Sequence, residues 1–256
     1  MFNKLLSAVE AGGSVNVLTV IDCVPADAVQ IGQMIIVEKD GNAAGQLDST
    51  LLEKIKETVQ KSVWVKPVII TLEAQQGGSV RLFWDRLVKK RSAVVFGGGH
   101  ISQPLVQMLS LLDFAVTVID DRPEFANTAR FPGASKVICE NFQQAVQHIS
   151  VDSDTAVIIV TRGHRYDLDC LRSTMDSNAG YLGMIGSRKR IREIIKLIKE
   201  EGAPPDIENR LRAPIGLDLK GETPAEIAVS IAAEVVAVFR GGSAASLSAA
   251  RGCSHG

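Results

Sequence analysis

A run of three glycines between a strand-like segment and a helix-like segment constrains this chain more than any other feature. The apolar sequence AVVF at residues 93–96 is followed directly by GGGH and then by an amphipathic stretch over 101–112. A tight turn from a strand into a helix requires positive φ, and a phosphate can approach the backbone and the positive end of the helix only where side chains are absent. We therefore predict a phosphate-binding turn with backbone donors from Gly97, Gly98 and Gly99, in which no β-branched residue fits at Gly99.

The turn matches part of the dinucleotide-binding pattern GxGxxG. Gly97 and Gly99 occupy the first two glycine positions, and Ser102 replaces the third glycine with a residue small enough for close helix packing. Asp120 ends the next apolar segment, 23 positions after Gly97, where a carboxylate would accept a hydrogen bond from a ribose hydroxyl. The alternative interpretation is a nucleotide-type fold whose site is empty or reused.

Apolar strands and helices alternate from residue 92 to residue 186. This repetition implies right-handed crossovers and a parallel sheet that is buried on both faces. Thr223-Pro224-Ala225-Glu226 then signals a last helix, because it combines an N-cap hydroxyl, a first-turn proline and a glutamate at the third position. We predict an α/β protein with a Rossmann-like, doubly wound parallel sheet. The expected strands are 93–96, 115–119, 136–139, 155–160 and 181–185, and the expected helices are 101–112, 142–148, 166–177, 187–200 and one from 224.

A smaller unit with a different residue pattern precedes this alternation. It ends at a charged boundary segment, Lys89-Lys90-Arg91. β-Branched segments, turn residues and one amphipathic stretch predict a small α+β domain. Its expected elements are strands at 15–24, 33–38, 68–72 and 80–84, a hairpin turn at 39–42 and a helix from Leu51. We therefore divide the chain into an α+β domain at 1–88, a Rossmann-like domain at 89–240 and a flexible tail at 241–256.

Composition excludes several classes of partner. The chain has 28 Lys and Arg residues against 29 Asp and Glu residues, so it lacks the excess of cations on which nucleic-acid binding depends. No segment has the apolar run of a membrane-spanning helix or of a signal peptide. The four cysteines, at 23, 139, 170 and 253, lack metal-ligand spacing. We expect a cytoplasmic protein that binds neither nucleic acid nor membranes.

Polar and small residues follow the predicted strands at the carboxyl edge of the sheet, where doubly wound folds bind ligands. Arginine and histidine there would neutralise the charge of a phosphate. Turns made of small residues would let the phosphate approach the backbone N–H groups at helix N-termini. We therefore predict a ligand that carries phosphate. The candidate binding residues are Gly97, Gly98, Gly99, His100, Asp120, Arg122, Arg162, Gly163, His164, Gly186, Ser187 and Arg188.

Each of these candidates has a structural alternative. His100 could cap its loop, Asp120 and Arg122 could form a salt bridge, and the cations that start at Arg188 could be solvated on a helix face. His164 and Asp167 have the spacing of two metal ligands, but two ligands do not make a site, and Asp167 would more simply cap a helix.

Five segments in series resemble the xanthine dehydrogenase accessory protein family, the XdhC/CoxI-like proteins. They are VVFGGGHIS, VTVIDDRPEFANTARFP, TRGHRYD, YLGMIGSRKR and RAPIGLDLKGETPAEIAVSIAAEVVA, and they cover about residues 93–240. The stretch PADAVQIGQMIIVEKDGNAAGQLDSTLLEKI is similar to the family's small N-terminal domain, including its DG turn and Glu53. Leu51 departs from the pattern, because family members often carry a cysteine there, and leucine can neither ligate molybdenum nor transfer sulfur.

The resemblance implies a non-catalytic maturation factor for molybdenum hydroxylases. Such a protein would bind the molybdenum cofactor, a molybdopterin, and pass it to a xanthine dehydrogenase-like apoenzyme after a cysteine desulfurase has acted. A homodimer is also implied. Within the site, Asp120 would address a hydroxyl or a pterin N–H, and His100, Arg162 and Arg188 would neutralise phosphate.

Two other functions stay open at this point. An NAD(P)-dependent oxidoreductase would suit the fold and Asp120, but only His100 and His164 are credible acid–base residues, and no separate substrate domain of the usual size is present. A regulatory module that senses a nucleotide and docks on a partner is the second alternative.

Overall fold

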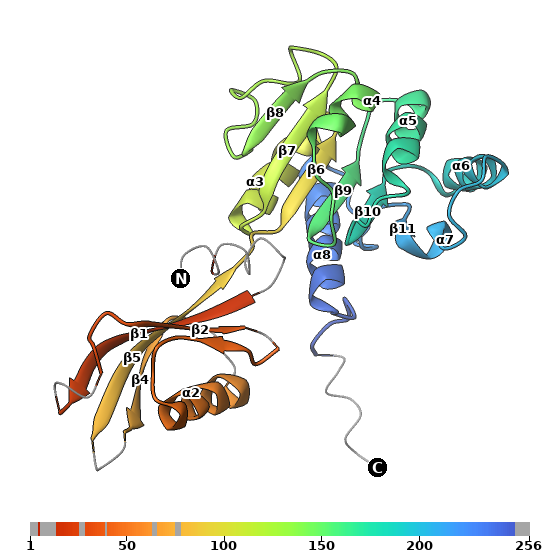
Figure 1. The fold of residues 1–256 in the computed structure, drawn as a ribbon. Coiled ribbons are helices and arrows are strands. Elements are labelled where there is room, and N and C mark those ends of the chain that lie inside the picture. Colours follow the sequence, from red (N-terminus) through yellow and green to blue (C-terminus); the bar gives the residue numbers. More distant parts are fainter. Residues whose placement is uncertain are drawn as a thin grey trace. The chain divides into compact units, whose positions relative to one another are not determined.

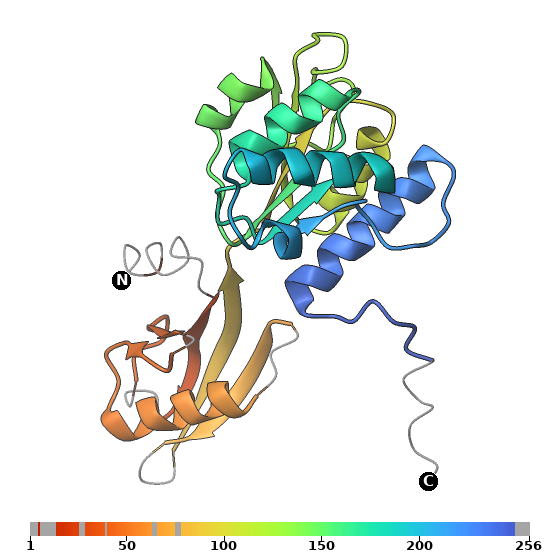
Figure 2. The same cartoon turned by 90° about the vertical axis from the view of Figure 1, so that its right-hand side faces the viewer.

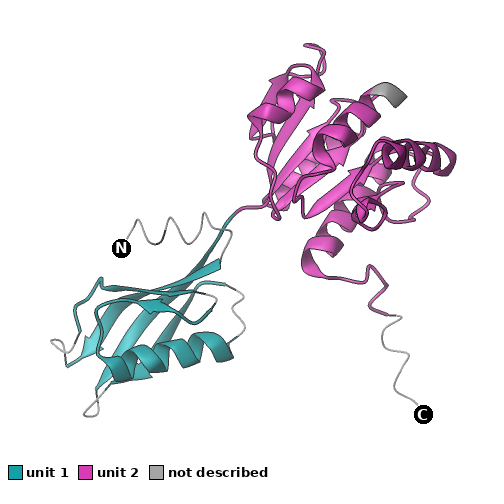
Figure 3. Cartoon of the chain, turned by 45° about the vertical axis from the view of Figure 1, so that its right-hand side comes forward, with its two compact units in different colours: residues 1–89 teal, residues 90–256 magenta. Residues whose placement is uncertain are grey.

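The computed structural model describes Leu5 and residues 14–25, 29–38, 40–62, 66–74 and 78–248. Its contacts divide the chain into two compact units, Met1–Lys89 and Lys90–Gly256 (Figure 3). The predicted tail lies outside the described residues from 249 onward. Within the described part of the chain, no helix is both long enough and apolar enough to cross a membrane.

The first unit contains a five-stranded antiparallel sheet in the order β3-β2-β1-β5-β4 (Figure 1). The predicted hairpin turn at 39–42, of which Lys39 lies outside the described residues, falls between β2 and β3, with Ile36 opposite Ala44. Strand β3 was not predicted, because two residues carry no readable alternation. The elements are β1 (Ser14–Val24), β2 (Met34–Glu38), β3 (Ala43–Ala44), α2 (Ser49–Lys61), β4 (Val68–Glu73) and β5 (Ser79–Val88).

Helix α2 covers one face of this sheet. Asp48 caps the helix by accepting hydrogen bonds from the amides of Thr50 and Leu51, both at 3.0 Å. Leu51 is only 3% exposed and belongs, with Ile55, to the buried cluster formed by the inner face of the sheet. The position where the related family often carries a cysteine is therefore a core position in this chain. Glu53, in contrast, is exposed and pairs with Lys56 at 2.7 Å.

The second unit confirms the predicted doubly wound sheet. Its six strands are all parallel and lie in the order β8-β7-β6-β9-β10-β11, so the chain starts at the centre, winds outward to β8 and returns to β9 on the other side. The elements are β6 (Ser92–Phe96), α3 (Ser102–Leu111), β7 (Ala115–Asp120), β8 (Lys136–Cys139), α4 (Phe142–Ala145), a 3₁₀ turn (Val146–His148), β9 (Thr155–Ile159), α5 (His164–Thr174), β10 (Tyr181–Met184), α6 (Arg188–Glu200), α7 (Ile207–Arg210), β11 (Leu211–Arg212) and α8 (Pro224–Arg240).

Alternate residues of each strand face opposite sides of this sheet. In β6, Ala93 and Val95 pack in a cluster with α3 and α8, whereas Val94 and Phe96 pack with α4, α5 and α6. The helices therefore cover both faces of the sheet (Figure 2). Burial on both faces explains why the strands read as unbroken apolar runs. The sequence did not indicate α7 and β11, since segments of four and two residues carry no periodicity.

The connection from β7 to β8 lacks a helix, whereas α3 connects β6 to β7 and α5 connects β9 to β10. Residues 121–135 form turns and contain no helix. Phe131 is 2% exposed and Ala126 is 8% exposed, so the segment is anchored to the body of the unit by its own apolar side chains. This compact loop lies where a doubly wound fold usually places a helix after its second strand.

A cysteine introduced at position 51 tests whether the family's thiol could act from that place. We expect the thiol of Leu51→Cys to resist a thiol reagent such as DTNB in the native protein and to react only in denaturant, because buried cysteines are inert. Cys139 is exposed and provides the internal control for reactivity. Rapid labelling of the additional thiol under native conditions would contradict the core placement of Leu51.

Candidate functional site

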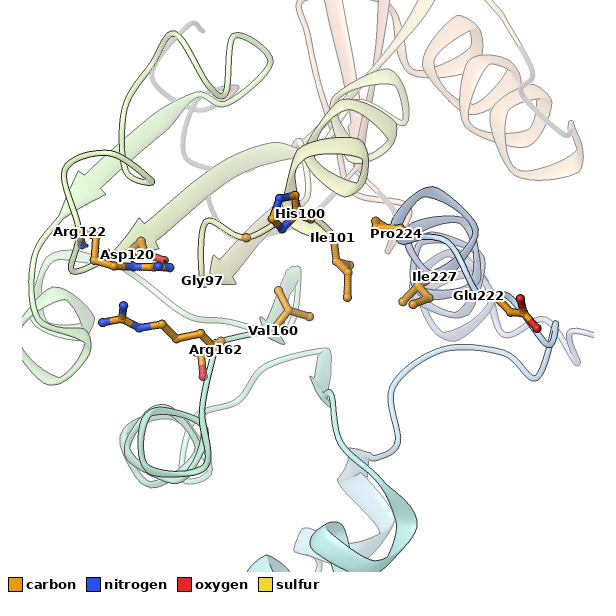
Figure 4. Close-up of a pocket in the computed structure, with 12 residues that line it drawn as sticks. Gly97, His100, Ile101, Asp120, Arg122, Val160, Arg162, Glu222, Pro224 and Ile227 are labelled. Carbon is orange, nitrogen blue, oxygen red and sulfur yellow. Dashed lines mark hydrogen bonds and ion pairs between the residues drawn. The ribbon is translucent and has the colours of Figure 1, made fainter.

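The order of strands in the second unit reverses between β6 and β9, and this is where open doubly wound sheets bind ligands. A cleft with a volume of about 320 Å³ opens at the carboxyl ends of these two strands (Figure 4). Six of the predicted site residues line it. The lining residues are Gly97, Gly99, His100, Ile101, Asp120, Arg122, Val160, Thr161, Arg162, Glu222, Pro224 and Ile227.

Two of the three glycines are required by the geometry of the turn. Gly97 has φ of +104°, and a Cβ atom there would lie 2.6 Å from the carbonyl oxygen of Val160. A Cβ atom at Gly98 would lie 2.5 Å from the carbonyl oxygen of Phe125. Gly99 has neither positive φ nor any atom within 4 Å of its Cβ position. The expectation that the turn itself excludes a β-branched residue at Gly99 was therefore wrong, and that restriction applies to Gly97.

Ser102 closes the turn from the helix side. The residue is completely buried, and its hydroxyl donates to the carbonyl oxygen of Gly97. The predicted need for a small residue at the third position of the pattern agrees with this burial. A glycine there would satisfy the packing but would leave the carbonyl of Gly97 without this donor.

The chain uses two of the three glycine amides within its own structure. Gly97 donates to the carbonyl oxygen of Ile119 at 2.8 Å, and Gly98 donates to Oδ2 of Asp120 at 2.8 Å. The prediction that all three amides face a ligand was thus wrong for these two. Among the hydrogen bonds of the described residues, none engages the amide of Gly99, which lies before the first turn of α3. Helix N-termini present such unpaired donors to anions.

Asp120 is fully engaged by donors of the protein. It is 1% exposed and accepts hydrogen bonds from the amide of Gly98 and from the amide, Nε and Nη2 of Arg122, the last three at 3.1, 2.9 and 3.0 Å. A carboxylate offers about four lone-pair sites, so these bonds occupy its acceptor capacity. Burial alone raises the pKa of Asp120, but the hydrogen bonds from Arg122 and Gly98 outweigh it and hold this pKa below its ordinary value.

A phenylalanine between two arginines supports the glycine turn. The guanidinium of Arg122 lies 3.5 Å from the ring centroid of Phe125, and that of Arg130 lies 5.0 Å from it. Arg130 also donates through Nε to the carbonyl oxygen of Gly98 at 3.0 Å. Phe125 and Arg130 were not predicted as site residues, although both lie in the stretch RPEFANTAR that resembles the family.

The two ends of the cleft differ in chemistry. The guanidinium groups of Arg122 and Arg162 lie at one end, and Ile101, Pro224 and Ile227 lie at the other (Figure 4). Arg162 has a 47% exposed side chain, its nearest carboxylate oxygen is Oδ1 of Asp121 at 3.7 Å, and its guanidinium lies 5.4 Å from the ring centroid of Tyr166. Its guanidinium is consequently available to a ligand, whereas the guanidinium of Arg122 is held by Asp120 and stacked on Phe125.

The apolar end of the cleft is built by the start of α8. Thr223 caps this helix by accepting from the amide of Glu226 at 3.3 Å, and Glu226 accepts in return from the amide of Thr223 at 2.9 Å. Farther along the helix, Glu234 accepts from the hydroxyl of Tyr181 at 2.6 Å and from the amide of Gly216 at 2.9 Å. These bonds hold the segment before α8 against the sheet. The sequence predicted the helix cap but not that it borders the cleft.

The remaining candidates lie outside the lining of this cleft. Gly163 is the N-cap of α5, Ser187 caps α6 by accepting from the amide of Arg190 at 3.3 Å, and Arg188 is exposed at the start of α6. Gly186 precedes that cap, and its Cβ position is 2.9 Å from Ile191. The side chain of His164 lies outside the described residues.

Asp167 does not cap its helix, contrary to the prediction. Gly163 is the N-cap residue of α5, and the fully buried carboxylate of Asp167, in the first turn, accepts from the hydroxyl of Thr161 and from the guanidinium of Arg190. Arg190 is thereby an internal ion-pair partner rather than a free cation. No three His, Cys, Asp or Glu side chains of the described ranges are grouped so that they could hold a metal ion.

Comparisons with known proteins match the second unit to one family. The model of the XdhC Rossmann domain matches residues 93–235. The uncharacterised protein YqeB of Escherichia coli is 27% identical over 216 residues, which is 79% of this chain and 40% of the relative. A probable xanthine dehydrogenase subunit of Bacillus subtilis is 27% identical over 158 residues, 62% of this chain and 46% of the relative.

A third relative and one solved structure extend the comparison. The molybdenum cofactor insertion chaperone PaoD of Escherichia coli is 30% identical over 88 residues, 34% of this chain and 28% of the relative. The matched regions therefore span less than half the length of each curated relative. A crystal structure described as a xanthine dehydrogenase from Bacillus halodurans has a TM-score of 0.56 at 18% identity and covers 96% of this chain and 97% of that chain, which shows the shared fold.

A pair of alanine substitutions compares Gly98, where the turn has no room for a Cβ atom, with Gly99, where it has room. Gly98→Ala is expected to lower the free energy of unfolding by about 1–3 kcal/mol, because its Cβ atom collides with a backbone carbonyl. Gly99→Ala is expected to change that free energy by no more than about 0.5 kcal/mol, because its Cβ position is open. Urea unfolding followed by circular dichroism measures both. Equal destabilisation by the two substitutions would contradict this geometry.

The carboxylate of Asp120 predicts a pH-dependent contribution to stability. Its folded-state pKa is lowered, so the contribution is present above the unfolded-state pKa of about 4 and is lost as pH falls through the lower folded-state value. We expect Asp120→Asn to cost about 1–3 kcal/mol at pH 7 and less at pH 3. Urea unfolding of both proteins at each pH measures the difference, and a cost that does not change with pH would refute the assignment.

Proposed function

This chain belongs to the XdhC family of accessory proteins, and from that premise we propose that it binds the molybdenum cofactor in the cytoplasm and delivers it to an apo molybdenum hydroxylase. The relatives named above include a molybdenum cofactor insertion chaperone, which supports a maturation role over a catalytic one. The proposed client is an enzyme of the xanthine dehydrogenase type. The cofactor is cargo in this proposal, so the protein has to hold it and release it unchanged.

The cleft at the carboxyl ends of β6 and β9 carries this proposal. It combines a cationic end, an unpaired amide before a helix N-terminus and an apolar end within one volume of about 320 Å³. A phosphorylated pterin presents the matching features, namely one doubly charged group and one flat ring. Phosphate contacts of this kind draw on both the helix dipole and the guanidinium charge.

Specific roles follow from the contacts of each residue. The amide of Gly99 and the side chains of His100 and Arg162 would bind the phosphate, because these groups line the cleft and Arg162 is held by only one distant carboxylate. Gly97, Gly98, Asp120 and Arg122 would act by fixing the shape of the turn. A pterin N–H contact to Asp120 would require one of the four donors of this carboxylate to move.

The residues at the starts of α5 and α6 would contact parts of the cofactor that extend beyond the cleft. Arg188 is exposed and follows the cap of α6, so an anion can approach its guanidinium from solvent, although the carboxylate of Asp218 also lies within its electrostatic reach. Gly163, His164, Gly186 and Ser187 belong to the same two turns at the carboxyl edge of the sheet. They would form the outer margin of the bound cofactor.

Partners of the proposed pathway act before and after this chain. A cysteine desulfurase would supply sulfur to the cofactor, and the apoenzyme would receive it. Direct sulfur transfer by position 51 does not belong to the proposal, because Leu51 is a buried aliphatic side chain. A homodimer is proposed as the assembly in which the chain works.

Arginine substitutions test the proposed site in a cofactor-producing host. The protein purified from such cells is expected to carry molybdenum and a pterin that fluoresces after oxidation. Arg162→Ala is expected to lower the bound fraction at least about tenfold, because hydrogen bonds to a charged group contribute roughly 1.5–3 kcal/mol. Arg188→Ala is also expected to lower it, through the outer contact.

The matched control is Arg172→Ala, which removes an arginine that pairs with Glu201 outside the cleft. Its bound molybdenum and pterin are expected to equal those of the unmodified chain. Unchanged binding in both Arg162→Ala and Arg188→Ala, with native circular dichroism spectra, would refute the site. Absence of any bound pterin in the unmodified chain would refute the function.

A further inference from the structure

The ligand crevice of a doubly wound sheet has two halves on either side of its first strand. A dinucleotide spans both, with its two phosphates at the glycine turn, one ribose at the carboxylate that ends the second strand, and the other nucleoside over the fourth strand. In this chain the two halves lie above β7 and above β9. The two halves differ in how much space the protein leaves for a ligand.

In the half above β7, a side chain of the protein occupies the position that a ribose would need. The carboxylate of Asp120, which a ribose would need, is 1% exposed and accepts three hydrogen bonds from Arg122 and one from Gly98. The guanidinium of Arg122 therefore stands where ribose hydroxyls would donate. Removing a bidentate guanidinium from a buried carboxylate would sacrifice two charge-assisted hydrogen bonds.

Further contacts hold the guanidinium of Arg122 in this position. Phe125 packs against the guanidinium of Arg122, and Arg130 approaches the same ring and donates to Gly98. The carbonyl oxygen of Phe125 lies so close to Gly98 that even a Cβ atom would collide with it. We name Arg122, Phe125 and Arg130 the arginine–phenylalanine plug. It belongs to the helix-free connection 121–135 and contacts the glycine turn at Gly98.

The half above β9 is open, and its lining is mostly apolar, with the carboxylate of Glu222 at its outer side (Figure 4). Val160, Ile101 and Ile227 line it, and Pro224 borders it at the start of α8 (Figure 4). The cationic end reaches this space through Arg162, which is separated from the end of β9 by Val160 and Thr161. The whole cleft has a volume of about 320 Å³, which is at the small end of the roughly 300–1,000 Å³ typical of ligand pockets. One ring and one phosphate fit these dimensions better than two nucleosides.

We propose that this cleft takes a ligand with a single phosphorylated ring, with the ring above β9 and the phosphate at Gly99 and Arg162, and that the plug excludes the second nucleoside of a dinucleotide. The identification of the ring as a pterin rests on the proposed function. The size limit and the orientation of the ligand rest only on the cleft and the plug.

Two commercially available nucleotides test the size limit on the unmodified full chain. Nicotinamide mononucleotide and NAD⁺ share one phosphorylated ring, and NAD⁺ adds adenosine monophosphate. We expect their dissociation constants, measured by isothermal titration calorimetry, to agree within about threefold, because the added half finds no site. A dissociation constant at least tenfold lower for NAD⁺ would overturn the proposal, and so would the absence of binding by every phosphorylated ring compound, including an oxidised pterin phosphate.

Arg122→Ala tests the plug directly. Its removal frees Asp120, so NAD⁺ is expected to bind at least about tenfold more tightly than the mononucleotide in this variant, whereas Arg172→Ala keeps the ratio of the unmodified chain. A folded Arg122→Ala protein with an unchanged ratio would overturn the role of the plug. If the variant does not fold, the ratio in the unmodified chain decides.

The same titrations separate this inference from the proposed function. Binding of the mononucleotide and NAD⁺ with similar constants, without binding of the pterin phosphate, would refute the pterin assignment and leave the size limit standing. Tight binding of the pterin phosphate together with preferential binding of NAD⁺ would refute the size limit and leave the function standing.

Discussion

The hydrogen bond from the amide of Gly98 to the carboxylate of Asp120 organises the candidate site. It joins the turn after β6 to the end of β7 and thereby fixes the backbone of the glycine turn relative to the sheet. The same carboxylate holds Arg122 through both of its oxygens, and Arg122 in turn stacks on Phe125. One buried charge therefore sets the turn, the orientation of one arginine and the path of the following loop. A buried carboxylate without these donors would be strongly unfavourable, so its partners form a single interdependent set.

This arrangement divides the cations of the site into two kinds. Arg122, Arg130 and Arg190 are occupied by partners inside the protein, whereas Arg162 retains an exposed guanidinium at the cleft. The chain as a whole is nearly neutral, but its arginines differ locally in whether a partner within the protein compensates their charge. In the proposed role, a phosphate held by one exposed guanidinium and a helix N-terminus could be released to a client without breaking a buried ion pair. The apolar wall formed by α8 would then position the ring rather than contribute charge.

Much of the fold could be read from the chain because the relevant signals are local. Unbroken apolar strands, helix caps such as Thr223 and the glycine turn define each element within a few residues, and the parallel order follows from the handedness of the crossovers. Strands β3 and β11 escaped detection, since two residues carry no pattern. The sequence analysis placed no helix between β7 and β8, in agreement with the structure, but it did not predict that this connection packs on the glycine turn, because turn residues do not reveal what a loop contacts. Asp167 was misread for a similar reason, since its partner Arg190 is 23 positions away.

The sequence by itself determined that a glycine turn joins a strand to a helix, that Asp120 and Arg162 lie at the carboxyl ends of two predicted strands, and that position 51 carries no thiol. The identities of these residues and their spacing over short stretches of sequence suffice for these conclusions. Tertiary structure alone decided which groups remain available to a ligand. It engaged the amides of Gly97 and Gly98 within the chain, left that of Gly99 without a partner among the described residues, and brought the start of α8 to the glycine turn from more than a hundred positions away. Hydrogen-bond capacity is finite, so the availability of a donor depends on every other group that the fold brings within reach.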